Sequence, residues 1–244
     1  MALFGSSNPF MKEEKFQNVL DAPMASEGTM TVSGAVNKTF ILTGLLLLTS
    51  VVSYLMPNII FMAVGGIGGF IAAIVAAFKP KLSNYLAPTY ALFEGLFIGT
   101  ISAIYAAAYS GIVINAFIST IGILVAMLFI YKSQVIEVTQ KFRVGVMAAT
   151  ASIALLYLVS IVLHFFGIEI PYLHEGGAMG IGISLLIIGI ATMNLLIDFD
   201  NIEKGAQYAS PKYMEWYSAM GLLITLVWLY LEMLRLLSKI ARSR

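Results

Sequence analysis

The stretch Leu195-Leu-Ile-Asp198-Phe-Asp200-Asn201-Ile-Glu203 decides how this chain folds, because it joins a long apolar run to three acids. The run before it, residues 176–197, carries no charge over 22 residues, enough helix to cross a hydrocarbon core of about 30 Å. Ionisable groups at or inside a membrane edge are costly unless they are paired or hydrated. Asp198, Asp200 and Glu203 are therefore candidate functional residues. The alternative is a solvated helix end at the headgroups, and it fits Asp198 least because Asp198 lies closest to the apolar run.

The composition places the chain in a membrane. Of its 244 residues, 59% are hydrophobic and 11% charged, with a mean hydropathy of +0.90, whereas soluble domains carry about 25% charged residues. A net charge of +1 provides no field that would attract nucleic acid. The chain has no cysteine, which excludes disulfides, thiolate metal sites and thiol nucleophiles. We expect the lipid bilayer to be its main partner.

Uncharged runs separated by breaks predict seven spans. Pro57-Asn58 divides the first run, because proline lacks a backbone donor and clashes with the preceding turn, and Tyr109-Ser110-Gly111 divides the second. The predicted spans cover residues 39–56, 59–78, 87–108, 112–131, 144–166, 178–197 and 213–240. Short links make consecutive helices antiparallel. We expect an all-α membrane protein with a polar cytoplasmic tail, residues 1–37, and a seven-helix transmembrane domain, residues 38–240.

Basic residues mark the cytoplasmic side of a membrane protein. The tail and the links after the second, fourth and sixth spans hold Lys12, Lys15, Lys38, Lys79, Lys81, Lys132, Lys141, Arg143, Lys204 and Lys212, and the other links hold none. This asymmetry predicts a cytoplasmic N-terminus. The last four basic residues, which begin at Arg235, disagree, because seven crossings place them outside. Seven full spans are favoured, since early segments usually dominate topology, and a re-entrant last segment stays open.

Two further acids, Glu94 and Glu232, stand inside apolar sequence. Asp198 and Asp200 do not face each other on a helix, so any site must recruit groups from other helices, and these two acids are the candidates. Their alternative roles are a hydrogen-bonded core acid for Glu94 and a local pair with Arg235 for Glu232. Two carboxyls in a poorly hydrated site cannot both ionise easily and titrate as a unit. A pair sharing a proton would hold two helices together, and its loss would free oxygens that suit Ca²⁺.

Catalytic motifs are missing from the sequence. His164 and His174 are ten residues apart and lack a metal-binding spacing, and neither Gly-x-Ser-x-Gly nor a phosphate-binding glycine loop occurs. We expect no enzymatic activity and no bound cofactor. Ca²⁺ enters as a candidate transported ion, with Asp198 and Glu232 as its candidate ligands.

Three segments, in their order and spacing, resemble the Bax inhibitor family of membrane proteins and its bacterial branch in particular. They read PTYALFEGL at 88–96, LIDFDNI at 196–202 and LYLEML at 229–234, and the resemblance covers about residues 38–239. It implies a bacterial inner-membrane protein with six helices around a central last helix and a pH-sensitive Ca²⁺ leak. It also implies a pH sensor of two aspartates on the sixth and seventh helices. Asp198 matches the first and Glu232 the second, as glutamate instead of aspartate.

The acid pair carries a geometric condition. Asp198 and Glu232 are 34 residues apart. If the last helix is regular from Tyr213, Glu232 lies about 28 Å along it at 1.5 Å per residue, far from an acid at the membrane edge. The pair therefore requires residues 213–221 to lie outside the bilayer, or the last segment to re-enter.

Three functional hypotheses follow. The first is a cation leak gated by Asp198 and Glu232, with Arg235 as charge partner and Glu94 or Asp200 along the ion path. The second is an interaction protein that modulates a membrane quality-control protease, with the N-terminal tail as its handle. The third is a proton-coupled secondary transporter, which has little support because Pro57 and Pro88 lie at span ends and do not break a span in its middle.

Overall fold

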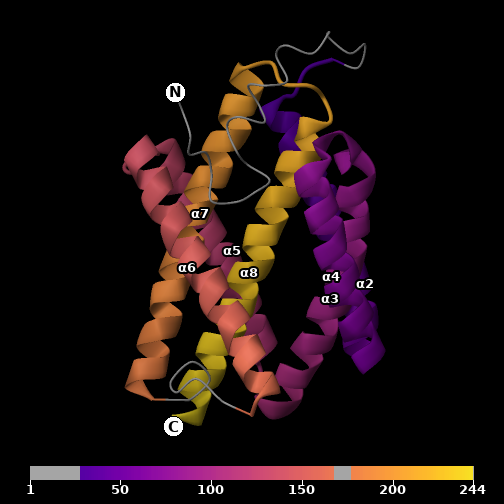
Figure 1. The fold of residues 1–244 in the computed structure, drawn as a ribbon, viewed down its shortest axis with the longest axis vertical. Coiled ribbons are helices and arrows are strands. Elements are labelled where there is room, and N and C mark those ends of the chain that lie inside the picture. The colour runs from indigo at the N-terminus through magenta and orange to yellow at the C-terminus, as the bar shows by residue number, and fades with distance from the viewer. Residues whose placement is uncertain (1–27, 168–176, 244) are drawn as a thin grey trace.

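The computed structural model describes residues 28–167 and 177–243, and these ranges contain seven long helices (Figure 1). The helices are α2 (Val32–Leu55), α3 (Ile59–Phe78), α4 (Ser83–Ala108), α5 (Ile112–Lys132), α6 (Gln140–Phe165), α7 (Ala178–Gln207) and α8 (Met214–Arg242), with a short 3₁₀ turn, η1 (Pro80–Leu82), before α4. Each of the seven is long and apolar enough to cross a membrane. The predicted all-α membrane fold is confirmed.

The breaks between the early helices occur where the sequence predicted them. Asn58 follows the proline that ends α2, and its side chain accepts a 2.9 Å hydrogen bond from the backbone N–H of Ile60, which caps α3. Gly111 adopts a left-handed φ of 73° in the turn between α4 and α5, a conformation that favours glycine.

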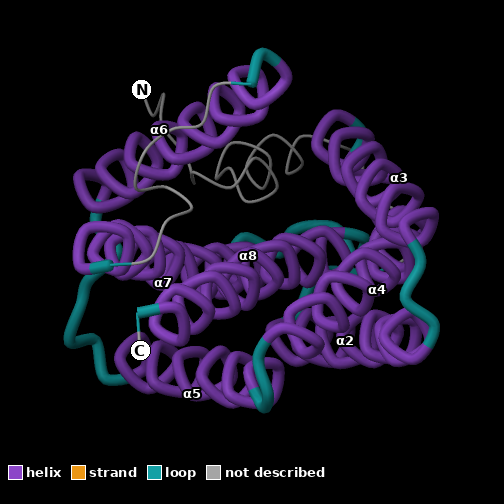
Figure 2. Tube along the Cα trace, turned by 90° about the horizontal axis from the view of Figure 1, so that it is seen from below, coloured by secondary structure: helices purple, strands orange, loops and turns teal. Residues whose placement is uncertain are grey.

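The last helix, α8, lies at the centre of the bundle and contacts α2, α4, α5 and α7 (Figure 2). It is the most buried of the seven spans. Its 29 residues form one unbroken helix of about 44 Å, so the re-entrant alternative is not observed. We call the end where α2 and α8 begin the N-terminal end of the bundle, and the end where α8 finishes the C-terminal end.

Glycines let α4 approach its neighbours closely. A Cβ atom on Gly95 would lie 2.3 Å from the backbone oxygen of Leu46 in α2, and one on Gly65 of α3 would lie 2.6 Å from the oxygen of Phe93 in α4. Close helix contact through small residues is typical of membrane proteins. These contacts attach α2 and α3 to α4, and α4 in turn packs on the central helix.

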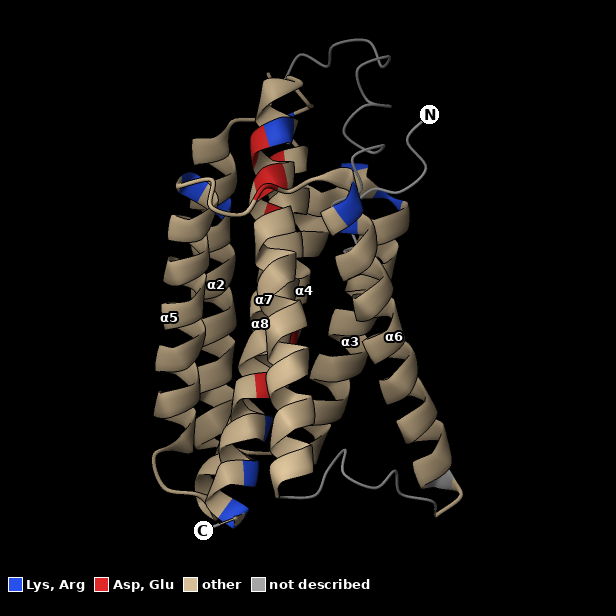
Figure 3. Ribbon diagram, turned by 90° about the vertical axis from the view of Figure 1, so that its left-hand side faces the viewer, with Lys and Arg blue, Asp and Glu red and all other residues tan. Residues whose placement is uncertain are grey.

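The first helix, α2, begins before the first predicted span. Residues 32–37, expected in the tail, form the first turns of α2, because Thr31 caps that helix by accepting a 2.9 Å hydrogen bond from Gly34 N. The rest of the expected tail, residues 1–27, and His174 lie outside the described residues. Charged residues gather at the N-terminal end of the bundle, and a smaller group follows α8 towards the C-terminal end (Figure 3).

Candidate functional site

Asp198 lies in the contact between α7 and α8 and is fully buried, with 0% of its surface exposed. The hydroxyl of Thr225 on α8 donates a 2.6 Å hydrogen bond to its Oδ2. One turn earlier on the same face of α7, the Asn194 amide donates to Thr150 on α6 at 2.8 Å. Asp198 is thus a buried acid inside the bundle with a hydroxyl partner on α8, nine residues before the end of α7 at Gln207.

Glu232 belongs to a different cluster. It is 1% exposed, and its Oε1 accepts hydrogen bonds from the hydroxyl of Tyr157 on α6 at 2.7 Å and from Arg235 at 2.8 Å. The Arg235 guanidinium also stacks over the Tyr157 ring, 4.8 Å from its centroid. The expected ion pair between Glu232 and Arg235 is present within α8, and Tyr157, which contacts both residues, joins this pair to α6.

Asp198 and Glu232 have separate hydrogen-bond partners on different levels of α8, so the contacts of the described residues give no support to the expected carboxyl pair. Asp198 of α7 lies opposite Thr225 of α8, to which it is hydrogen-bonded. Glu232 is seven residues after Thr225, which is two turns or about 10 Å along the axis of α8. The helix α8 is regular from Met214, which is the geometry expected to keep the two acids apart.

Asp200 takes part in ion pairs at the N-terminal end of the bundle. Its Oδ2 pairs with Arg143 of α6, and with Lys204 at 3.1 Å. Arg143 is buried and also donates to the Asn201 side chain at 2.7 Å. Among the described residues, Asp200 thus joins α6 to α7 as a charge partner, which gives no support to its expected place on an ion path.

Glu94 faces α3. Its Oε2 lies 2.7 Å from the position that a Cβ on Gly69 would occupy, and 8% of the residue surface is exposed. Within the described ranges, no hydrogen bond or ion pair joins Glu94 to Asp198 or Glu232. Glu94 is therefore a buried acid of the α3–α4 contact, separate from the α7–α8 contact.

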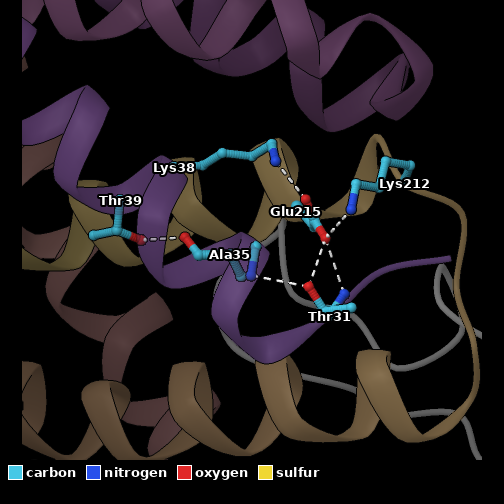
Figure 4. A network of polar contacts seen from close by, with 7 residues as sticks. Thr31, Ala35, Lys38, Thr39, Lys212 and Glu215 are labelled. Atoms are coloured by element: carbon cyan, nitrogen blue, oxygen red, sulfur yellow. Dashed lines mark hydrogen bonds and ion pairs between the residues drawn. The ribbon is translucent and has the colours of Figure 1, made fainter. Parts of the chain in front are cut away.

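Glu215 is a fully buried acid that sequence reasoning gave no role (Figure 4). Its Oε1 accepts from the backbone and the hydroxyl of Thr31 at 2.9 and 3.0 Å and from Lys212 at 3.0 Å, while Oε2 pairs with Lys38. Gly34 leaves it room, since a Cβ there would lie 2.0 Å from Oε1. We call these residues the Glu215 clamp. They fasten the start of α2 to the start of α8.

Buried polar residues repeat along α8 at intervals of seven: Ser218, Thr225, Glu232 and Lys239. Seven residues are two helical turns, about 10 Å, with a drift of only about 20°. The four side chains therefore share one face of the central helix, which we call the polar stripe. It contacts α7 at Thr225 and Lys239 and α6 at Glu232. The spacing of seven was a signal in the sequence that pointed to this face.

Comparison with known proteins identifies the family. A family model described as "Bax inhibitor 1 like" matches residues 8–242. The chain belongs to this family. Comparison with curated proteins and with solved structures gave no match.

The hydrogen-bond partner of Asp198 on α8 differs from the one that the family resemblance implied. The resemblance implied a second acid facing it, and in this Bax inhibitor family member the facing residue is Thr225. In the described part of the chain, no three His, Cys, Asp or Glu side chains gather as a metal site.

A cavity of about 520 Å³ lies between α2, α4, α5 and α8. Its wall is mostly apolar, with hydroxyls such as those of Ser102 and Tyr230, which are hydrogen-bonded to each other at 2.7 Å. Among the described residues, those that line the cavity carry no charge. The polar stripe and its partners on α6 and α7 are thus a better candidate for an ion path than this cavity.

Proposed function

We propose that this Bax inhibitor family member is a pH-sensitive leak for cations, Ca²⁺ among them, along the contact of α7 and α8. The observation that carries the proposal is the full burial of Asp198 against Thr225 on the polar stripe. Ionisable residues inside a membrane protein mark ion and proton pathways by default. We further propose that the N-terminal end of the bundle faces the cytoplasm of a bacterial cell and that the membrane is the inner one.

Protonation of Asp198 supplies the gate. The neutral acid, hydrogen-bonded to Thr225, is compatible with a dry contact, so α7 and α8 stay packed. The ionised carboxylate costs several kcal/mol in a dry site. Water that enters to solvate it opens the contact between the helices and supplies the hydrated path that a cation needs. The leak therefore increases as the pH rises.

We expect Asp198 to determine how the cation leak depends on pH. A coupled pair of carboxyls releases its protons in two steps that belong to the pair. On α8, the residue hydrogen-bonded to Asp198 is Thr225, whose hydroxyl does not titrate near neutral pH, so we expect the contact of α7 and α8 to contribute one proton to the titration of the leak. Glu232, held by Tyr157 and Arg235, should contribute to packing more than to the pH response.

The experiment is Ca²⁺ flux into proteoliposomes that enclose a Ca²⁺-sensitive dye, measured from acidic to neutral pH. Asp198→Asn should remove the pH dependence. Glu137→Gln, at an exposed acid of the link before α6, is the matched control and should leave it intact. Unchanged flux and pH dependence in Asp198→Asn would rule out Asp198 as the gate, and a wild-type flux equal to that of empty liposomes would end the proposal.

A further inference from the structure

Lys239 is a buried cation near the C-terminal end of the bundle. Only 2% of its surface is exposed, and its ammonium group donates to the backbone oxygen of Gly180 at 3.0 Å and to the hydroxyl of Ser184 at 2.9 Å. Both oxygens belong to the first two turns of α7. The side chain of α8 therefore reaches across to the start of α7.

This position is costly for a cation in two ways. Burial of an ammonium in a membrane span is expensive without a counter-ion, and in the described part of the chain no acid lies within ion-pair distance of Lys239. Glu232, two turns away on the polar stripe, pairs with Arg235. The start of α7 is also the positive end of that helix dipole, which disfavours a cation. A neutral residue would meet neither cost.

The two oxygens are of a kind that binds permeant cations. Carbonyl and hydroxyl oxygens replace the hydration shell of ions in membrane pathways, and Ca²⁺ takes carbonyl oxygens among its ligands. We propose that Lys239 is a tethered cation that occupies the cation site formed by Gly180 and Ser184 and limits the leak at this end. This inference rests on the proposed leak, and it assigns a second control point on the same path.

Geometry separates this point from Asp198. Along the polar stripe, Thr225 opposite Asp198 is fourteen residues from Lys239, about 21 Å of helix. Glu232 and Arg235 between them form a neutral pair. Lys239, which has no acid at ion-pair distance among residues 28–167 and 177–243, therefore repels a cation approaching from the C-terminal end, independently of the state of Asp198.

Lys239→Met tests the inference, because methionine keeps the length and apolar stem of lysine without its charge. Lys239 lies about 10 Å along α8 from Glu232, the next member of the stripe, and with this repelling charge removed we expect the Ca²⁺ leak to rise about tenfold. Arg242→Gln is the control: it removes a charge three residues later, where the arginine donates to Tyr109 at 2.8 Å, away from the stripe. Gel filtration should show both variants eluting like the wild type.

The absence of native cysteine permits a chemical rescue. In Lys239→Cys, the thiolate attacks aminoethyl methanethiosulfonate, a mixed disulfide forms and methanesulfinate leaves, so that an ammonium returns near its original position. Mass measurement of the protein verifies the product. We expect a raised leak before modification and a leak near the wild-type value after it. Methyl methanethiosulfonate, which adds no charge, should leave the leak raised.

The outcomes distinguish the inference from the proposed function. A leak in Lys239→Met equal to or below that of the wild type, or an equal rise in Arg242→Gln, would overturn the tethered cation and leave the Asp198 gate standing. Equal closure by the charged and uncharged reagents would do the same, because it would show an effect of size alone. Flux equal to that of empty liposomes in the wild type and every variant would overturn both.

Discussion

Thr225 on α8 donates a 2.6 Å hydrogen bond to the buried Asp198 on α7. A hydroxyl can donate to a carboxylate and can also accept from or donate to a protonated acid. The partner therefore suits either protonation state of Asp198, whereas a second carboxylate would repel the ionised form. This contact makes Thr225 the natural point at which to alter the proposed gate without removing the acid.

Thr225→Val replaces the hydroxyl by a methyl group of similar size. The ionised Asp198 then loses a hydrogen bond to a charged group, worth about 1.5–3 kcal/mol, while the neutral acid loses less. We expect the midpoint of the flux–pH curve to move about one unit higher, as measured in proteoliposomes. Thr225→Ser keeps the donor and should keep the midpoint, and a shift of the same size in both variants would contradict the role of the hydrogen bond.

Thr225→Asp rebuilds the acid pair that the family resemblance implied. Two carboxyls at hydrogen-bond distance share a proton and titrate as a unit. We expect a leak that is lower than wild type at acidic pH and a pH dependence spread over two steps. Asp198→Asn/Thr225→Asp, with one acid in the pair position, should restore a one-step curve. A one-step curve in Thr225→Asp itself would show that the two side chains do not couple.

The pair of Glu232 and Arg235 should matter for stability. Arg235→Gln leaves Glu232, which is 1% exposed, as a buried charge without its cation, and breaking a buried pair costs about 3–5 kcal/mol. Because Arg235 is 27% exposed, we expect the low end of that range, seen as a lower melting temperature in detergent. Glu232→Gln leaves a partly hydrated cation and should cost less. The reverse order would contradict the burial argument.

The sequence predicted most of the fold because its signals are local. The uncharged runs, the proline before Asn58 and the left-handed Gly111 each act within one helix or turn, and the structure places breaks at both. The helix α2 begins at Val32, ahead of the predicted span 39–56, and its cap at Thr31 is stabilised by Glu215, which is 184 positions away in the chain. Such long-range contacts leave no local pattern.

The site was predicted in part. Asp198 was singled out because it follows an uncharged run, and it is buried, but its partner depends on how α8 lies against α7. The link between them is compact: Ser210 N bonds to Gly205 O at 3.1 Å and Ala209 takes a left-handed φ of 51°. The helix α8 therefore begins at Met214, seven residues after the end of α7. This start places Thr225 opposite Asp198. Tertiary packing sets this register, and sequence spacing alone did not reveal it.

Gly34→Ala tests the Glu215 clamp. The added Cβ would lie 2.0 Å from Oε1 of Glu215, so the buried acid must move away from its partners at Thr31 or Lys38. We expect a loss of about 1–3 kcal/mol, measured by thermal unfolding in detergent. Gly44→Ala on the same helix has nothing within 4 Å of its Cβ and should stabilise by about 0.5–1 kcal/mol. A stable Gly34→Ala would show that the clamp contributes nothing.

The N-terminal tail is the segment expected to bind a membrane protease. The contacts of Met30 and Thr31 with the helix bundle set the boundary for a deletion that tests this hypothesis. Met30 is buried, its N–H bonds to Ser210 O at 2.6 Å, and Thr31 belongs to the Glu215 clamp. Deletion of residues 1–27 removes the tail before these contacts. We expect it to abolish co-purification with the protease and to leave both the melting temperature and the Ca²⁺ leak unchanged.

Deletion of residues 1–31 is the comparison for this test. It also removes the cap of α2, worth about 1 kcal/mol, and two of the hydrogen bonds to the buried carboxylate of Glu215. It should therefore lower the melting temperature, so that loss of protease capture in this deletion alone would reflect damage to the bundle. Capture that persists after deletion of residues 1–27 would show that the protease recognises the helices.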